Sequence, residues 1–188
     1  MVVSGNLEKT PFHELVGIIS KQTGILELWN LPGRSRYTLY IKEGNLRCLQ
    51  HNGQFVEPLQ TKAKLLEIMG AGTGLFELSV RWFKTPVDPA LNWPLERVLL
   101  SLTIMDEEIK FRTIELVPPG IRFKLVSGKE PNAPRNIFWQ KAKPHLQHGI
   151  NAQELARLLG LSEEMICYYF SKLERQQIIE VQRAQPVG

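Results

Sequence analysis

The most chemically suggestive part of this sequence is a strip of basic residues between positions 121 and 145. It carries six Lys or Arg side chains and one acidic residue, Glu130, whereas the whole chain of 188 residues has a net charge of only +4. Phe123, Phe138 and Trp139 are interleaved with the cations. Such a strip can hold nucleic-acid phosphates through charge and counterion release, and a solvated linker flanked by core aromatic residues has the same composition. The basic residues are Arg122, Lys124, Lys129, Arg135, Lys141 and Lys143.

Two short helices joined by a tight turn are expected after this strip. Asn151 can cap the first helix, Gly160 allows a sharp turn, and Ser162 can cap the second helix. Three apolar residues of the second helix are spaced to form one inward face, so a second set should face away from the core. The inward set is Ile166, Phe170 and Leu173, and the outward set is Ser162, Met165, Tyr168, Ser171 and Lys172.

The outward face predicts where DNA would bind, because in a DNA-binding helix-turn-helix the second helix enters the major groove. Ser and Lys side chains can contact phosphates or base edges, and Tyr can contact phosphate. Glu163 and Glu164 count against this interpretation, since they place negative charge near the groove. The candidate DNA-binding residues are Arg135, Lys141, Lys143, Ser162, Tyr168, Ser171 and Lys172.

Other residues that could perform chemistry lack the partners that the chemistry needs. The glycine-rich run at residues 70–74 follows a helix and precedes a strand, the reverse of a phosphate-binding loop. His145 and His148 are three residues apart but have no Cys or carboxylate beside them. Cys48 and Cys167 are expected to be small apolar residues rather than nucleophiles. The sequence therefore predicts a protein that is not an enzyme and has no metal and no cofactor.

The elements of the N-terminal half alternate between helical and strand-like patterns. Thr10 and Pro11 predict a helix start, and Gly24 is placed to end that helix. Strands are expected at residues 25–29, 37–41, 46–50 and 76–82, with a tight turn at residues 43–45 forming a hairpin. Helices are expected at residues 59–69 and 91–102. This mixture of helices and antiparallel strands predicts an α+β fold.

Short motifs in this half recur in a fixed order over about the first 85 residues, and the ordered set resembles the bacterial PATAN domain. They are Gly5-Asn6-Leu7, residues 12–16, residues 23–26, residues 40–46 and residues 74–78. The resemblance implies a small α+β module of bacterial signalling proteins that mediates protein contacts. It brings no catalytic residues. Residues 151–162 and 172–179 are similar to the helix-turn-helix of bacterial winged-helix regulators, and this resemblance implies a winged-helix fold from about residue 137.

We therefore expect three segments: a PATAN-like α+β domain at residues 1–126, a linker at 127–136 and a winged-helix-like domain at 137–188. No apolar run is long enough to span a membrane, and residues 1–12 do not have the pattern of a signal peptide, so a cytoplasmic location without membrane contact is expected.

The main functional hypothesis is a regulator that binds double-stranded DNA through its C-terminal domain and a protein partner through its N-terminal domain. The alternative is a signalling adaptor whose winged helix mediates protein contacts or dimerisation without DNA. A homodimer is compatible with both hypotheses. Small-ligand sensing in the N-terminal module ranks last, because the sequence shows no pocket pattern.

Overall fold

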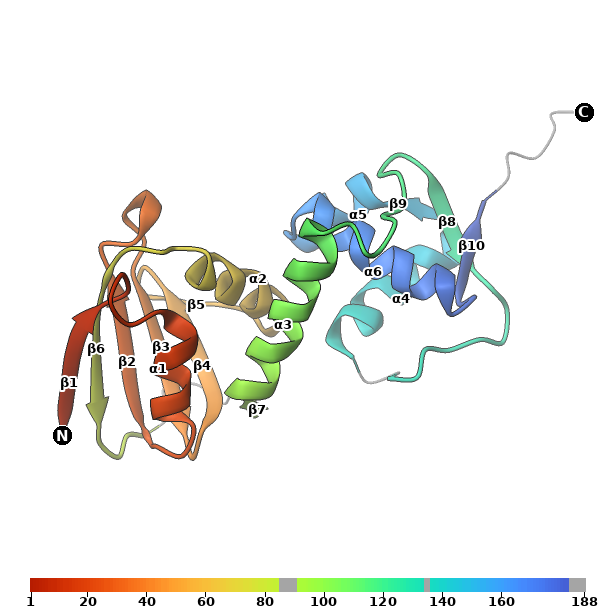
Figure 1. Ribbon diagram of the computed structural model, residues 1–188. Coiled ribbons are helices and arrows are strands. Elements are labelled where there is room, and N and C mark those ends of the chain that lie inside the picture. The colour runs from red at the N-terminus through yellow and green to blue at the C-terminus, as the bar shows by residue number, and fades with distance from the viewer. Residues whose placement is uncertain (85–90, 134–135, 183–188) are drawn as a thin grey trace, which may run out of the picture. The chain divides into compact units, whose positions relative to one another are not determined.

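The computed structural model describes residues 1–84, 91–133 and 136–182 and divides into two compact units, Met1–Thr103 and Ile104–Gly188. Both units combine helices with antiparallel strands (Figure 1), which confirms the predicted α+β class. No helix in the described part of the chain has the length and the apolar character that crossing a bilayer requires.

The first unit is built on an antiparallel sheet in the order β1-β6-β2-β3-β4-β5, with β7 also pairing with β4. Alternation places Leu26 and Leu28 in the core and leaves Ile25 and Glu27 on the opposite face. The predicted hairpin is confirmed: Glu43 and Gly44 both have positive φ, as a tight two-residue turn requires. The strands are β1 (Val2–Asn6), β2 (Gly24–Trp29), β3 (Tyr37–Lys42), β4 (Asn45–His51), β5 (Gln54–Phe55), β6 (Leu75–Val80) and β7 (Trp93–Pro94).

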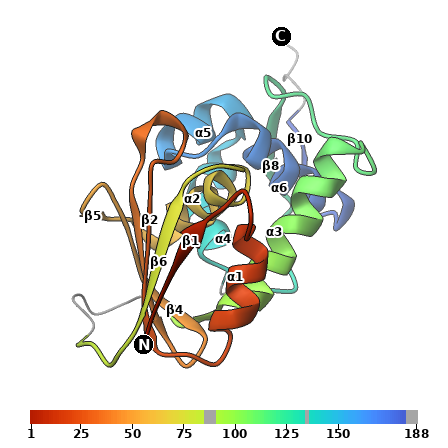
Figure 2. The same cartoon turned by 60° about the vertical axis from the view of Figure 1, so that its left-hand side comes forward.

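Helices α1 (Phe12–Ile19) and α2 (Pro58–Met69) bury apolar stripes in this unit, and Figure 2 shows α1 beside the sheet. Two details of the prediction for α1 are wrong. Thr10 is not the cap, because Pro11 holds that position and no side chain caps the helix. Gly24 does not end the helix; it starts β2, where a Cβ would collide with the backbone of β6. Helix α3 (Leu95–Lys110) extends eight residues beyond the predicted end and runs across the division between the units.

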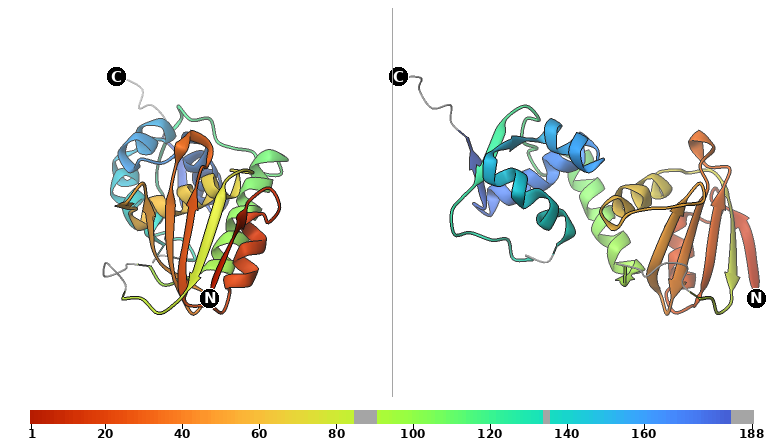
Figure 3. Two further views of the ribbon diagram at one scale, coloured as in Figure 1. Left: turned by 90° about the vertical axis from the view of Figure 1, so that its left-hand side faces the viewer. Right: turned by 180° about the vertical axis from the view of Figure 1, so that it is seen from behind.

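The second unit packs three helices with a small sheet in the order β10-β8-β9 (Figure 3). The middle strand of this sheet, β8, comes before these three helices in the chain. All three strands of the sheet therefore lie within residues 122–181. The apolar residues Ile166, Phe170 and Leu173 face the core as predicted. The elements are β8 (Arg122–Leu125), α4 (Ile137–His148), β9 (Ile150–Asn151), α5 (Ala152–Leu159), α6 (Glu163–Arg175) and β10 (Ile179–Val181).

The division between the units differs from the predicted linker at residues 127–136. Phe123 of β8 pairs with Ile150 of β9 and with Val181 of β10, so β8 belongs to the second unit. The polar stretch after β8 is therefore a connection within the second unit. Its composition resembled a linker because surface loops and linkers share polar, turn-forming residues.

Candidate functional site

Helix α6 was expected to present a free face to DNA, and this expectation is wrong. Tyr168 and Ser171 are only 9% and 2% exposed, and Met165 is also buried. The inward stripe of α6 is buried as well, so the helix is covered on both sides between Met165 and Leu173. A helix segment that is covered on both sides belongs to the core, so the residues between Met165 and Leu173 do not form the free polar face that was expected.

The cover on the expected DNA face comes from the start of the second unit, residues 104–117. The backbone N–H of Val117 donates to Ser171 Oγ at 2.9 Å, and that hydroxyl donates to the carbonyl of Cys167, also at 2.9 Å. Both hydrogen bonds are buried, and Ile114 and Val117 are themselves core residues. Ser171 therefore holds the covering segment to α6.

Glu108 holds the other two candidate residues on this face. The Tyr168 hydroxyl donates to one carboxylate oxygen at 2.6 Å, and Lys172 Nζ donates to the other at 2.9 Å. These bonds, that from Lys172 first and that from Tyr168 second, lower the pKa of the Glu108 carboxyl. Burial and the same hydrogen bond raise the pKa of the Tyr168 hydroxyl. Glu108 is half-buried and neutralises Lys172.

Ser162, another candidate residue, acts as the N-cap of α6. Its hydroxyl accepts a hydrogen bond from the Met165 backbone N–H at 3.2 Å, as the capping prediction requires. Asn151 likewise caps α5 through the Glu154 N–H, and Gly160 ends that helix in the left-handed conformation. The helix boundaries in the second unit thus follow the sequence closely.

We predict that Ser162→Ala lowers the stability of the second unit by about 1 kcal/mol, because the N–H of Met165 loses its partner. Ser162→Asp restores an acceptor and should recover most of this loss. Urea denaturation of the two variants and the wild type measures the difference. Equal stability of all three would contradict the capping role.

Three of the five cations that the structure describes in the basic strip are paired with carboxylates. Lys143 pairs with Glu130 at 2.6 Å, Arg122 pairs with Glu154 at 2.9 Å, and Lys124 pairs with Glu180 at 3.4 Å. Two of these carboxylates lie outside the strip in the sequence, so the local count of charges could not reveal the pairing. Lys141 is exposed, and Arg135 lies outside the described residues.

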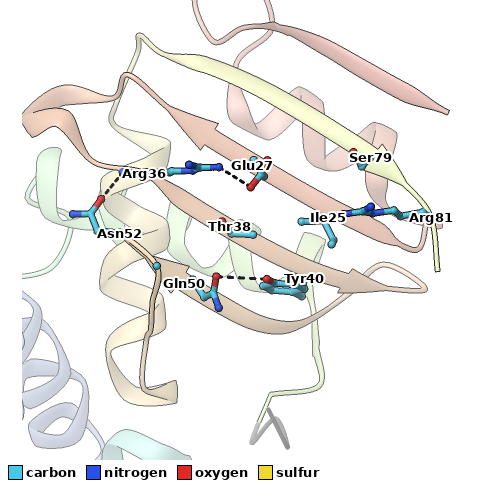
Figure 4. A pocket seen from close by; sticks show the side chains of 10 residues that line it. Ile25, Glu27, Arg36, Thr38, Tyr40, Gln50, Asn52, Ser79 and Arg81 are labelled. Atoms are coloured by element: carbon cyan, nitrogen blue, oxygen red, sulfur yellow. Dashed lines mark hydrogen bonds and ion pairs between the residues drawn. The ribbon is translucent and has the colours of Figure 1, made fainter. Parts of the chain in front are cut away.

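A hollow that the sequence did not predict lies on the outward face of the first unit's sheet. Its volume is about 500 Å³, and Figure 4 shows it from the open side with the helices behind the strands. Alternate residues of neighbouring strands point into it, because outward side chains of β2, β3 and β4 lie in register. Its polar lining includes Arg36, Thr38, Tyr40, Gln50, Ser79 and Arg81.

Two arginines reach into this hollow from its opposite ends (Figure 4). Arg36 pairs with Glu27 at 2.9 Å, and its backbone N–H donates to the Asn52 side chain at 2.9 Å. Arg81 makes no ion pair or side-chain hydrogen bond to any described residue. Burial raises the pKa of the Tyr40 hydroxyl, and the charge of Arg81 acts in the opposite direction. The hollow can therefore offer guanidinium and hydroxyl donors to a ligand.

The sequence contained a partial signal for this site. Thr38 and Tyr40 alternate with the apolar residues of β3, and Ser79 and Arg81 continue the alternation of β6, so each was recognisable as outward-facing. Which strands are neighbours was not recognisable, because β6 pairs with β2 across about 50 residues of chain. The convergence of these side chains is a consequence of the sheet order.

The structure also shows the surroundings of the two cysteines and of His148, the other residues considered for catalysis or metal binding. Burial raises the pKa of the Cys48 and Cys167 thiols to about 11, so neither is a thiolate nucleophile at neutral pH. His148 Nδ1 lies 2.9 Å from the Pro144 carbonyl oxygen. Within residues 1–84, 91–133 and 136–182, no group of three or more His, Cys, Asp or Glu is placed to hold a metal ion.

No protein-family model, curated protein or solved structure matches this chain.

Proposed function

We propose that this chain is a non-enzymatic adaptor of PATAN type whose winged-helix-like second unit works through protein contacts and not through DNA. The observation that carries the proposal is the burial of α6. The face that would enter a DNA groove is part of the hydrophobic core, and its hydroxyl and ammonium groups are bound by residues 108–117 of the same unit.

The charges of the second unit support the same conclusion. DNA affinity requires cations that are free to neutralise phosphates. Each phosphate contact that is lost lowers the affinity and also reduces how steeply the affinity falls with salt concentration. Lys143, Lys172 and Arg122 each have a carboxylate partner within 3 Å. A duplex would have to compete with these carboxylates for the cations, which supports the adaptor over the DNA-binding hypothesis.

The exposed apolar side chains of this unit favour protein contacts. Phe111 and Leu158 are 74% and 61% exposed, and neither is required by the core. Single exposed apolar residues are common on protein surfaces, so they do not define an interface. They do offer the anchors that an adaptor needs and that phosphate binding does not use.

The test is a fluorescence-anisotropy titration of the full chain with duplex DNA at low salt. We expect no saturable binding at micromolar protein concentration. The proposal would be overturned in favour of the DNA-binding hypothesis by saturable binding that Lys141→Gln weakens. The logarithm of the binding constant would then fall with the logarithm of the salt concentration at a slope of about −3 to −5.

A pull-down from a bacterial lysate treated with nuclease supplies the complementary measurement. Partners of an adaptor should be retained after nuclease, and a bait with Phe111→Gln or Leu158→Gln should lose part of them. The exposed Gln153→Ala variant of α5 serves as the matched control and should retain them. Disappearance of all partners on nuclease treatment would argue against the adaptor.

A further inference from the structure

We propose that the hollow on the outward face of the first unit's sheet binds a small ligand through an anionic oxygen group, either a carboxylate or a phosphate. The site goes beyond the proposed adaptor function, which depends on the second unit. It would make the first unit a ligand-sensing module. Among the functions considered from the sequence, small-ligand sensing ranked last.

The charges of the hollow favour an anion. Its charged lining residues are Arg36, Arg81 and Glu27, and the single carboxylate is already bound to Arg36 at 2.9 Å. Glu77 lies opposite Glu27 in the sheet but does not line the hollow. Arg81 therefore presents a guanidinium without a carboxylate partner among the described residues. Guanidinium groups hold carboxylates and phosphates in two-point contacts.

The neutral polar groups are also suited to such a ligand. Thr38 is 9% exposed, and its hydroxyl has no hydrogen-bond partner within the described part of the chain. The Tyr40 hydroxyl has only a long contact, 3.5 Å, with the Gln50 side chain. Both hydroxyls lie on β3 between the two arginines (Figure 4). An oxyanion at this position could accept hydrogen bonds from both hydroxyls and from Arg81.

The size and rigidity of the hollow favour a small molecule. Its volume of about 500 Å³ lies within the range of about 300–1,000 Å³ that is typical of small-ligand sites. Its floor consists of paired strands, and Asn52 fixes the backbone at Arg36 through the 2.9 Å hydrogen bond. Side chains on a paired sheet need little reorganisation to bind. Ile25 is the apolar side chain of the lining, so a mainly polar ligand is expected.

The experiment is an NMR titration of the full ¹⁵N-labelled chain with three separate small probes, inorganic phosphate, adenosine monophosphate and citrate, and with an Asp-rich peptide as a fourth titrant. We expect saturable shifts of the Arg81 side-chain Nε–H and of the backbone amides around Ile25, Thr38 and Ser79 with at least one probe. A response to the phosphates alone or to citrate alone would identify the source of the oxyanion.

Arg81→Gln is expected to weaken binding by about 10- to 100-fold, and Tyr40→Phe by about fivefold, because each removes a donor to the anion. Arg97→Gln is the matched control: it removes the same charge from an exposed position of the first unit outside the hollow. Far-UV circular dichroism checks that the variants are folded.

Three results would overturn the proposal: no saturable shift with any probe up to about 10 mM, equal weakening by Arg97→Gln, or binding of an Asp-rich peptide without binding of any small probe. The last result would assign the hollow to a protein partner. None of them bears on the DNA titration of the second unit, so the two proposals fail independently.

Discussion

Replacing Ser171 with alanine is expected to destabilise the second unit by about 1–3 kcal/mol, although the change removes only one oxygen atom. The oxygen accepts from the Val117 N–H at a position that water does not reach. Alanine leaves this N–H buried without an acceptor, and an unsatisfied buried donor costs its full desolvation free energy. On a DNA-facing helix surface the same substitution would change stability very little.

Native-state hydrogen exchange provides the measurement. The amides of α6 should exchange about five- to 150-fold faster in Ser171→Ala, as the expected loss of stability converts at about 1.4 kcal/mol per tenfold. Ser127→Ala removes a hydroxyl from an exposed turn of the same unit and should leave α6 unchanged. Unchanged protection of α6 in Ser171→Ala would show that residues 104–117 do not cover the helix in solution.

Glu108→Gln is expected to cost about 1–2 kcal/mol at neutral pH, after allowance for the partial exposure of the ion pair. The substitution keeps the shape of the side chain and removes the charge that Lys172 contacts at 2.9 Å. Glutamine can still accept from the Tyr168 hydroxyl, so the covering segment should stay in place. The loss should appear in urea denaturation as a lower midpoint for the second unit.

The effect of Glu108 depends on pH in a defined direction. The carboxyl has a pKa below its ordinary value of 4.5 in the folded state, because Lys172 and Tyr168 bind the charged form. Its contribution is therefore fully present above about pH 4.5 and is lost as the pH falls through the lower, folded-state pKa. The difference in stability between wild type and Glu108→Gln should shrink accordingly.

Glu107→Gln is the matched control for this pH series. It removes the same charge from the neighbouring position of α3, where the side chain is exposed. We expect Glu107→Gln to change the free energy of unfolding little at neutral pH. Its difference from wild type should not change on acidification in the way expected for Glu108→Gln. If Glu107→Gln reproduced the behaviour of Glu108→Gln, the effect would come from the general charge of the helix rather than from the contact with Tyr168 and Lys172.

Local features of this protein were predictable from the sequence alone. The hairpin at residues 43–45, the caps at Asn151 and Ser162, and the turn at Gly160 are formed by residues close together in the chain. The inward stripe of α6 was predicted from helical periodicity. The α+β class was predicted because the sequence combines helical and strand-like hydrophobic patterns. Backbone preferences and amphipathic patterns act over a few residues, so sequence spacing is sufficient to read them.

Only the tertiary structure decided which surfaces of those elements are free. Periodicity identifies the more apolar face of α6, but it cannot show that residues 104–117 return to cover the polar face through Glu108 and Val117. It also cannot show that β6 lies beside β2 and so brings Arg81 to the same hollow as Arg36. Contacts between residues 50 or more positions apart depend on chain topology, and neither composition nor local spacing determines that topology.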